Sequence, residues 1–146
     1  ILFPKIHITL VDSLNKRINF LNEVIKELDL KNIEAVHSRI EDYAKENREK
    51  YDLVVARAVA SLNILLEYSA PIIKINKNFV AMKANIDEEL ENCKNAMQKL
   101  SLELVDRKEF ILPKEESKRN LLLFKKKKAT EKKYPRSSGE IKKKPL

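Results

Sequence analysis

The sequence predicts an α/β fold built on a parallel sheet, and three observations support this. Short, apolar, β-branched runs alternate along the chain with longer segments in which apolar residues recur every three or four positions. The first predicted strands each stop at a polar residue, which is typical of buried parallel strands. The 146 residues, 43% of them hydrophobic, are enough for one domain with a real core. Helices are therefore expected on both faces of the sheet, joined to it by right-handed crossovers.

The opening segments form the first strand, helix and second strand of this prediction. Ile6–Val11 is a largely apolar run that stops at Asp12. Ser13 follows, and because its hydroxyl can accept a backbone N–H of the first helical turn, we expect it to cap a helix. Ile33–His37 is the second predicted strand. The helix between the two strands is predicted from apolar residues at steps of four and three, which are Leu14, Ile18, Leu21, Ile25 and Leu28.

The middle of the chain continues the alternation. Ile40–Arg48 is predicted as a short polar helix or loop, and Tyr51–Ala56, which ends at Arg57, as the next strand. Ser61 is expected to cap a helix that Pro71 ends or kinks. The residues expected on one face of this helix are Leu62, Leu65, Leu66 and Ser69.

The last third supplies one more strand and helix and then a hairpin. Phe79–Met82 is predicted as a strand closed by Lys83, and Asp87 is expected to cap the helix after it. Glu103–Leu112 and Asn120–Lys125 are joined by a polar stretch, so an antiparallel hairpin is their natural form. The expected core positions of the helix are Leu90, Cys93, Met97 and Leu100.

Charge divides the chain into a neutral body and a basic end. The net charge is +8, and residues 125–146, with 10 basic against 2 acidic side chains, hold the whole excess. Such a distribution indicates a polyanion partner, usually nucleic acid, although a tail that only aids solubility gives the same pattern. Beyond Lys128 the sequence is polar and proline-marked, so we expect it to be mobile. The predicted domains are therefore residues 1–128 and a flexible basic tail, residues 129–146.

Several classes of site are excluded by composition. Gly139 is the only glycine, so no glycine-rich phosphate loop lies within these residues. Cys93 has no second cysteine to pair with, and with His7 and His37 alone beside it no zinc cluster is expected. The longest apolar runs are far shorter than the roughly 18 to 20 residues that cross a bilayer. No metal and no membrane contact are expected, and a cytoplasmic location follows by default.

Polar residues follow the predicted strands at the sheet edge where α/β ligands bind. They are Asp12, the Arg39 and Glu41 pair, and Arg57. Asp12 is placed to accept hydrogen bonds from ribose hydroxyls, and a nicotinamide-type site would use the same residue. Capping the next helix, or pairing with its dipole, explains Asp12 equally well.

Six blocks of sequence resemble one known family. They are LVDSLNKRINFLNEV, HSRIEDYA, YDLVVARAVASLNILLEY, NFVAMKA, RNLLLFKK and KKYPRSSGEIKKKPL. Their order and spacing resemble the glucose-inhibited division protein B family, S-adenosylmethionine-dependent methyltransferases that modify guanine N7 in bacterial 16S ribosomal RNA. The resemblance spans essentially the whole chain. It implies a class I methyltransferase, Rossmann-like sheet with strand order 3-2-1-4-5-7-6, an enzyme with 16S ribosomal RNA or the small ribosomal subunit as partner, and a monomer.

The resemblance also implies roles for individual residues. Asp12 matches the acid that faces the cofactor ribose, and Ile40 and Glu41 match the pair beside the adenine. Arg57 matches the family's cofactor-site arginine, where the methyl donor and target base meet, and is the expected catalytic residue. No acid/base set is expected, because guanine N7 needs no deprotonation before it attacks the methyl group.

Contacts with RNA are expected from a second group of residues. By resemblance, Arg39, Lys83 and Arg119 are assigned to the RNA phosphates or the target guanine. Tyr134 and Arg136, set among lysines, are expected to bind RNA by charge and stacking. The alternatives are a surface ion pair of Arg39 with Glu41 or Asp42, a solvated strand-end lysine at position 83, and a charged hairpin edge at position 119.

The chain departs from the family at its start. It begins just before the second strand, so the first strand and its glycine-rich cofactor loop have no counterpart, and an N-terminally truncated fragment is expected. Opening the middle of the sheet leaves buried backbone groups unpaired. We therefore expect the isolated chain neither to fold well nor to bind S-adenosylmethionine tightly. Four residues, Asn76, Lys77, Asn78 and Ala84, also stand where members of the family commonly carry glycine.

Two other functions compete with the methyltransferase. A non-enzymatic RNA-binding or ribosome-binding module explains the neutral body and basic end without any chemistry. A dehydrogenase-like nucleotide domain comes third, because no residue after Asp12 supports nicotinamide binding.

Overall fold

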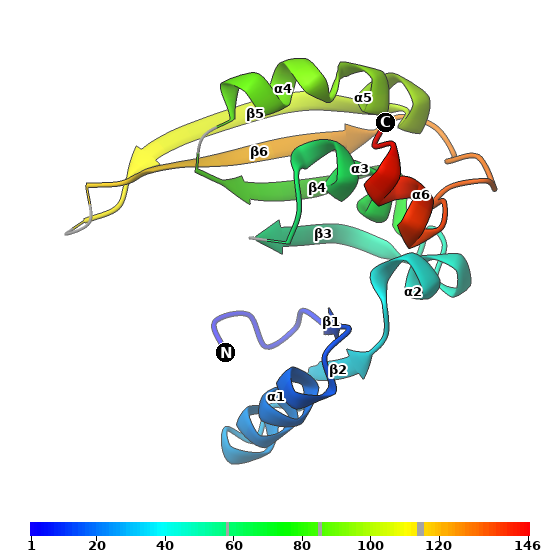
Figure 1. The fold of residues 1–146 in the computed structure, drawn as a ribbon. Helices are drawn as coiled ribbons and strands as arrows, with labels where there is room; N and C mark the ends of the chain where they lie inside the picture. The colour runs from blue at the N-terminus through cyan, green and yellow to red at the C-terminus, as the bar shows by residue number, and fades with distance from the viewer. Residues whose placement is uncertain (58, 85, 114–115) are drawn as a thin grey trace. The chain divides into compact units, whose positions relative to one another are not determined.

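The computed structural model describes residues 1–57, 59–84, 86–113 and 116–146 and divides into two units, Ile1–Tyr43 and Ala44–Leu146 (Figure 1). This division differs from the predicted domains, residues 1–128 and 129–146. Its origin lies in the strand order, since the described strands form a two-stranded sheet, β1-β2, and a four-stranded sheet, β3-β4-β6-β5.

The first unit is a parallel strand–helix–strand motif, as predicted. Its two strands pair in register from Ile8 with Ile33 to Asp12 with His37. Ile18, on the predicted apolar face, is the buried residue of the intervening helix. The elements are β1 (Ile8–Asp12), α1 (Asn15–Glu27), β2 (Ile33–His37) and the start of α2 (Ile40–Glu46).

The second unit contains the rest of the predicted elements. β3 pairs with β4 in parallel, and β6 pairs with both β4 and β5 in antiparallel fashion, so the C-terminal hairpin is confirmed. The strands are β3 (Tyr51–Arg57), β4 (Ile73–Lys83), β5 (Leu102–Ile111) and β6 (Lys118–Lys126). The helices are α3 (Leu62–Ser69), α4 (Asp87–Asn92), α5 (Lys94–Leu100) and α6 (Ser138–Lys143).

The core of the second unit lies between one face of the four-stranded sheet and the helices α3, α4 and α5 (Figure 1). Phe79 of β4 and Phe124 of β6 stack on this face with ring centroids 6.0 Å apart. Burying one large apolar side chain of this kind contributes about 1.5–3 kcal/mol. Fully buried apolar residues of the same core include Leu62 and Leu66 of α3, Cys93 between α4 and α5, and Ala96 and Leu100 of α5.

The two predicted serine caps are wrong. Ser13 gives no cap, and the N–H of Leu14 is instead bonded to Asp12 Oδ1 at 2.8 Å. Ser61 also makes no cap hydrogen bond, because its hydroxyl donates to Asn63 Oδ1 at 2.8 Å. Next to Ser13 the Asp12 carboxylate accepts the backbone N–H, and at Ser61 the Asn63 side chain accepts the serine hydroxyl.

Strand β4 begins six residues earlier than predicted, at Ile73. Asn76, within this extension, has φ 64°, the left-handed region that favours glycine. This is one of the positions where the family commonly carries glycine, and asparagine tolerates that conformation better than most residues.

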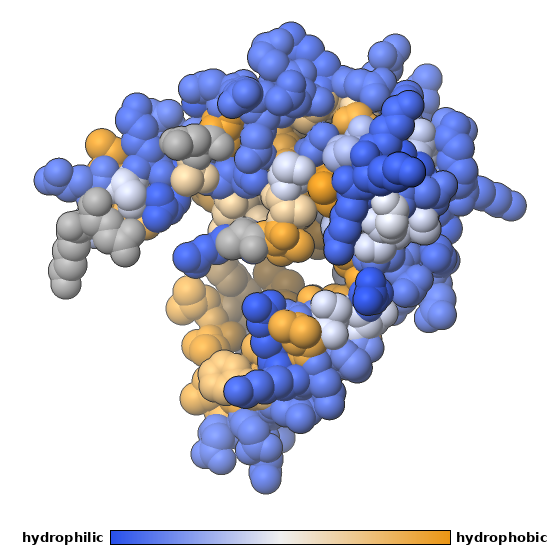
Figure 2. Space-filling model, in the orientation of Figure 1, coloured by the Kyte–Doolittle hydropathy of each residue, from blue (hydrophilic) through white to orange (hydrophobic). Residues whose placement is uncertain are grey.

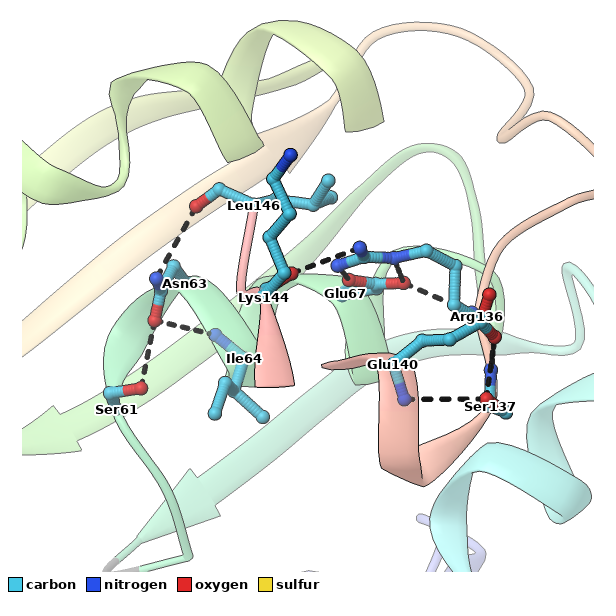
Figure 3. Close-up of polar contacts among 9 residues, drawn as sticks. All are labelled: Ser61, Asn63, Ile64, Glu67, Arg136, Ser137, Glu140, Lys144 and Leu146. Carbon is cyan, nitrogen blue, oxygen red and sulfur yellow. Dashed lines mark hydrogen bonds and ion pairs between the residues drawn. The ribbon is translucent and has the colours of Figure 1, made fainter. Parts of the chain in front are cut away.

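The C-terminal segment is anchored to α3 by one buried ion pair (Figure 3). The Arg136 guanidinium donates from Nη2 to Glu67 Oε2 at 2.6 Å and from Nε to Oε1 at 2.8 Å. The backbone N–H of Arg136 donates to the same Oε1 at 3.0 Å, and Glu67 is fully buried. The hydrogen bonds to Glu67 raise the pKa of Arg136.

Residues 129–146 therefore differ from the expected mobile tail. Arg48 donates to the carbonyls of Tyr134 and Thr130, both at 2.6 Å, and Ser137 with Glu140 forms a capping box at the start of α6. Lys126, counted with the basic excess, is fully buried and donates to the carbonyl of Ile73 at 2.8 Å. Its burial lowers the pKa of its ammonium. Part of the basic end thus serves the fold.

Replacing Arg136 tests the anchor. Arg136→Met leaves Glu67 buried without its partner, so we expect it to lower the free energy of unfolding by about 3–5 kcal/mol in urea denaturation. Glu67→Leu combined with Arg136→Met removes both charges and should restore most of that free energy. Lys133→Met breaks an exposed pair with Glu131 and, as the control, should change stability by no more than about 1 kcal/mol. Equal destabilisation of the two single variants would contradict the anchor.

Cys93 reports on folding of the second unit. Burial raises the pKa of its thiol to about 11, so the reactive thiolate is scarce in the folded chain at mildly alkaline pH. We expect a thiol reagent such as Ellman's reagent to react with Cys93 only as urea unfolds the chain. Because the sequence has one cysteine, the signal has a single source. Prompt reaction in native buffer would instead agree with the poorly folded chain that the sequence predicts.

Candidate functional site

Asp12 lies at the carboxyl end of β1, directly opposite His37 of β2. Its Oδ1 accepts the Leu14 N–H at 2.8 Å and its Oδ2 pairs with Arg17 Nη1 at 3.1 Å. The first of these bonds is the main cause that lowers the pKa of Asp12, so the carboxylate is ionised at neutral pH. The helix-capping alternative is thus present in the structure, and the 24% exposed side chain keeps lone pairs for further donors.

The other residues of the first unit gather at the same edge of its sheet. Ile40 and Glu41 begin α2 three residues after β2 ends. The Glu41 side chain is only 8% exposed, and Arg39 Nη1 lies 3.9 Å from its Oε1. The surface ion pair considered for Arg39 is therefore formed, at the outer limit of such a contact. Asp12, Ile40 and Glu41 thus all follow the carboxyl ends of the two parallel strands of this unit.

Three predicted residues of the second unit line one cavity of about 560 Å³, namely Arg57, Lys83 and Arg119. Arg57 ends β3 and Lys83 ends β4, so the cavity lies at the carboxyl end of these parallel strands. A volume of this size is typical of ligand sites. The remaining lining residues are Met82, Ala84, Glu89, Phe110, Leu112, Asn120 and Leu121.

Lys83 has a structural role inside this cavity. Its side chain is 13% exposed, and its Nζ lies 2.9 Å from Glu89 Oε2 and donates to the Ala60 carbonyl at 3.0 Å. The same Oε2 accepts the N–H of Leu62 at 2.8 Å, so Glu89 supplies the cap that Ser61 does not. The ammonium is therefore neither the solvated lysine of the alternative nor an open phosphate contact.

Sequence reasoning missed Glu89, Phe110 and Asn120. Glu89 stands in an acidic helix start that resembles any solvated first turn, and Phe110 lies in a strand whose other apolar residues suggested core. Asn120 is buried and donates to the Ala84 carbonyl at 2.6 Å, which holds β6 against the turn after β4. Asn120 alone had a signal available in advance, since it begins a predicted strand.

Tyr134 and Arg136 lie elsewhere, near the start of β3, because Arg48, three residues before that strand, donates to the Tyr134 carbonyl at 2.6 Å. Tyr134 is 4% exposed and Arg136 is held by Glu67, so both side chains serve the fold. They line a second cavity of about 660 Å³ whose other lining residues include Lys45, Lys99, Lys132, Lys133 and Lys144. Hydrophilic side chains cover the surrounding surface of α5 and the C-terminal segment (Figure 2).

The described residues hold neither a cluster of metal ligands nor a membrane-spanning helix. They contain no group of three or more His, Cys, Asp or Glu side chains placed to hold a metal ion. Within the same ranges, every helix is too short or too polar to span a membrane.

The sequence matches a family of known proteins. A family model described as GidB, rRNA small subunit methyltransferase G, matches residues 1–122. Ribosomal RNA small subunit methyltransferase G of Acetivibrio thermocellus is 51% identical over 148 residues, covering 100% of this chain and 61% of that protein. Its namesake from Bacillus pumilus is 49% identical over 149 residues, covering 100% and 62%. The chain spans less than two thirds of the length of these curated relatives.

The fold matches solved methyltransferases. The structure of N-methyltransferase NodS from Bradyrhizobium japonicum WM9 superposes with a TM-score of 0.60 at 14% identity, covering 84% of this chain and 74% of that one. This likeness confirms the predicted class I methyltransferase sheet. Because the family model covers most of the chain and the relatives align with all of it, the chain belongs to the GidB family, rRNA small subunit methyltransferase G.

Proposed function

We propose that the protein methylates N7 of a guanine in 16S ribosomal RNA with S-adenosylmethionine as methyl donor. The observation that carries this proposal is the identity of about half to relatives named ribosomal RNA small subunit methyltransferase G along the whole chain. The cavity formed by Arg57, Lys83 and Arg119 at the carboxyl end of the sheet supports it, because ligands of such sheets bind there.

The first unit supplies the residues that would hold the cofactor. Asp12 and Glu41 offer carboxylate oxygens for ribose hydroxyls and an exocyclic amine, and Ile40 offers an apolar contact. When bound, S-adenosylmethionine supplies an electrophilic methyl group on its sulfonium. The lowered pKa of Asp12 keeps its carboxylate in the accepting form.

Arg57 is proposed to orient the guanine. N7 attacks with an in-plane lone pair, so no general base is required, and alignment of the two reacting atoms controls the rate. Methylation makes the base cationic, and a guanidinium does not stabilise that charge. Donation from Arg57 to the guanine O6 would instead fix the base and leave N7 free.

The lysine-rich cavity is proposed to contact RNA phosphates in place of Tyr134 and Arg136. Lys99, Lys132 and Lys144 line it, and no carboxylate pairs with their side chains among the described residues. This arrangement also serves the non-enzymatic RNA-binding alternative, which differs in requiring no methyl transfer.

Substitution of Arg57 tests the enzyme. The test uses the chain extended to the length of its relatives. Arg57→Gln is expected to lower the rate of methyl transfer to 16S ribosomal RNA about 100-fold, because misplacing a reacting atom by roughly 1 Å costs about that much in rate. The product is identified as N7-methylguanine by borohydride reduction and aniline cleavage. Lys16→Gln removes the same charge from α1, outside both cavities, and should leave the rate unchanged. RNA binding without N7-methylguanine in the unsubstituted protein would favour the non-enzymatic module.

The salt dependence of binding tests the phosphate contacts. Lys132→Gln with Lys144→Gln should weaken binding of single-stranded RNA and lower the slope of log K against log salt by about 0.7 for each phosphate that is no longer neutralised. Substitution is preferred to deleting residues 129–146, since deletion also removes Arg136 from buried Glu67. A slope equal to that of the unsubstituted chain and of Lys16→Gln would contradict the assignment.

A further inference from the structure

Phe110 is an exposed aromatic side chain at the candidate active site. It lies near the end of β5, the residue is 41% exposed, and it is absent from the buried core of the second unit. Among the described aromatic residues it alone lines the cavity that holds Arg57, Lys83 and Arg119. The other strongly exposed phenylalanines, Phe3 and Phe20, lie in the first unit.

The strand register places Phe110 beside cationic groups. Phe110 pairs directly with Arg119 of β6, and directly opposed residues of an antiparallel pair project on the same face. Leu121, two residues along β6, and Met82, its partner on β4, continue that face. Arg57 is in turn the partner of Met82. Near the carboxyl end of β3 and β4, one face of the sheet therefore carries an aromatic ring, the apolar side chains of Leu121 and Met82, and two guanidinium groups.

This combination fits a nucleobase better than a phosphate alone. An aromatic ring offers a stacking surface to any base, and guanidinium groups bind the neighbouring phosphates or base edges. Enzymes that act on a base often take it out of its stack, and a protein ring that takes over the stacking offsets part of that cost. Among the described residues that line the cavity of about 560 Å³, the one carboxylate is that of Glu89, which is occupied by Lys83 and Leu62.

We propose that Phe110 is the stacking platform for the unstacked guanine of the RNA substrate, with Arg119 beside it across the strand pair. The inference rests on the proposed function, since it names the residue that positions the base of that reaction. Phe110 takes no part in bond making. Its contribution is to hold the ring of the base while N7 faces the methyl donor.

The absence of tryptophan from the sequence makes a direct test possible. Phe110→Trp places one indole on the cavity, and stacking of a guanine quenches indole fluorescence. The probe is a single-stranded oligoribonucleotide with one guanosine among uridines, compared with the same strand abasic at that position. Binding is followed independently by the anisotropy of a fluorophore on the RNA. We expect the guanosine strand to quench Trp emission strongly and the abasic strand to quench it little at equal saturation.

Matched variants separate stacking from other effects. Phe20→Trp, on α1 with Phe20 67% exposed, is the control and should respond equally to both strands. Phe110→Leu keeps an apolar side chain but removes the ring, so it should weaken binding of the guanosine strand about 5- to 150-fold and leave the abasic strand unaffected. Phe110→Tyr should retain affinity.

The outcomes distinguish the stacking role of Phe110 from the proposed function on RNA. Saturating RNA binding with the same Trp emission for both strands would overturn the stacking role and leave the RNA substrate standing. Equal affinities of the unsubstituted chain and Phe110→Leu for the guanosine strand would do the same. Failure of the unsubstituted chain to bind either strand would instead contradict the RNA-directed function on which the stacking rests.

Discussion

One carboxylate, that of Glu89, organises the carboxyl end of the sheet in the second unit. It receives the ammonium of Lys83 at the end of β4 and the first backbone N–H of α3 at Leu62. A strand and two helices are thereby joined through one carboxylate group, and the N-terminal dipole of α3 is compensated by a negative charge. Because Lys83 and Arg57 end neighbouring strands, the shape of the cavity depends on this contact.

The two cations that end β3 and β4 differ in their partners. Lys83 is held by Glu89 and the Ala60 carbonyl, whereas no partner of the Arg57 side chain is found in the described part of the chain. At the other end of the sheet, Arg136 and Lys126 are held by Glu67 and Glu49, while lysines around them remain open to solvent. Arg136 and Lys126 therefore hold parts of the fold together.

The sequence predicted the strands, most helices and the hairpin because these depend on local periodicity. It was less successful where a partner lies far along the chain. The cap of α3 comes from Glu89, 27 residues after Leu62, so Ser61 was the only candidate visible locally. Arg57, Lys83 and Arg119 were predicted from strand ends and family resemblance, whereas the exposure of Phe110 depends on the register of β5 with β6. No local pattern distinguishes that phenylalanine from a core residue.

The buried ion pair between Glu67 and Arg136 has a consequence for the order of events during synthesis. The two residues are separated by 69 positions, so α3 leaves the ribosome long before its arginine is made. Until then Glu67 is a carboxylate without a partner on a helix that otherwise packs into the core, and packing it there is unfavourable. Strands β4, β5 and β6 are all synthesised in that interval. The second unit is thus completed late in synthesis, because a nascent chain interrupted before Arg136 lacks the guanidinium group that Glu67 binds.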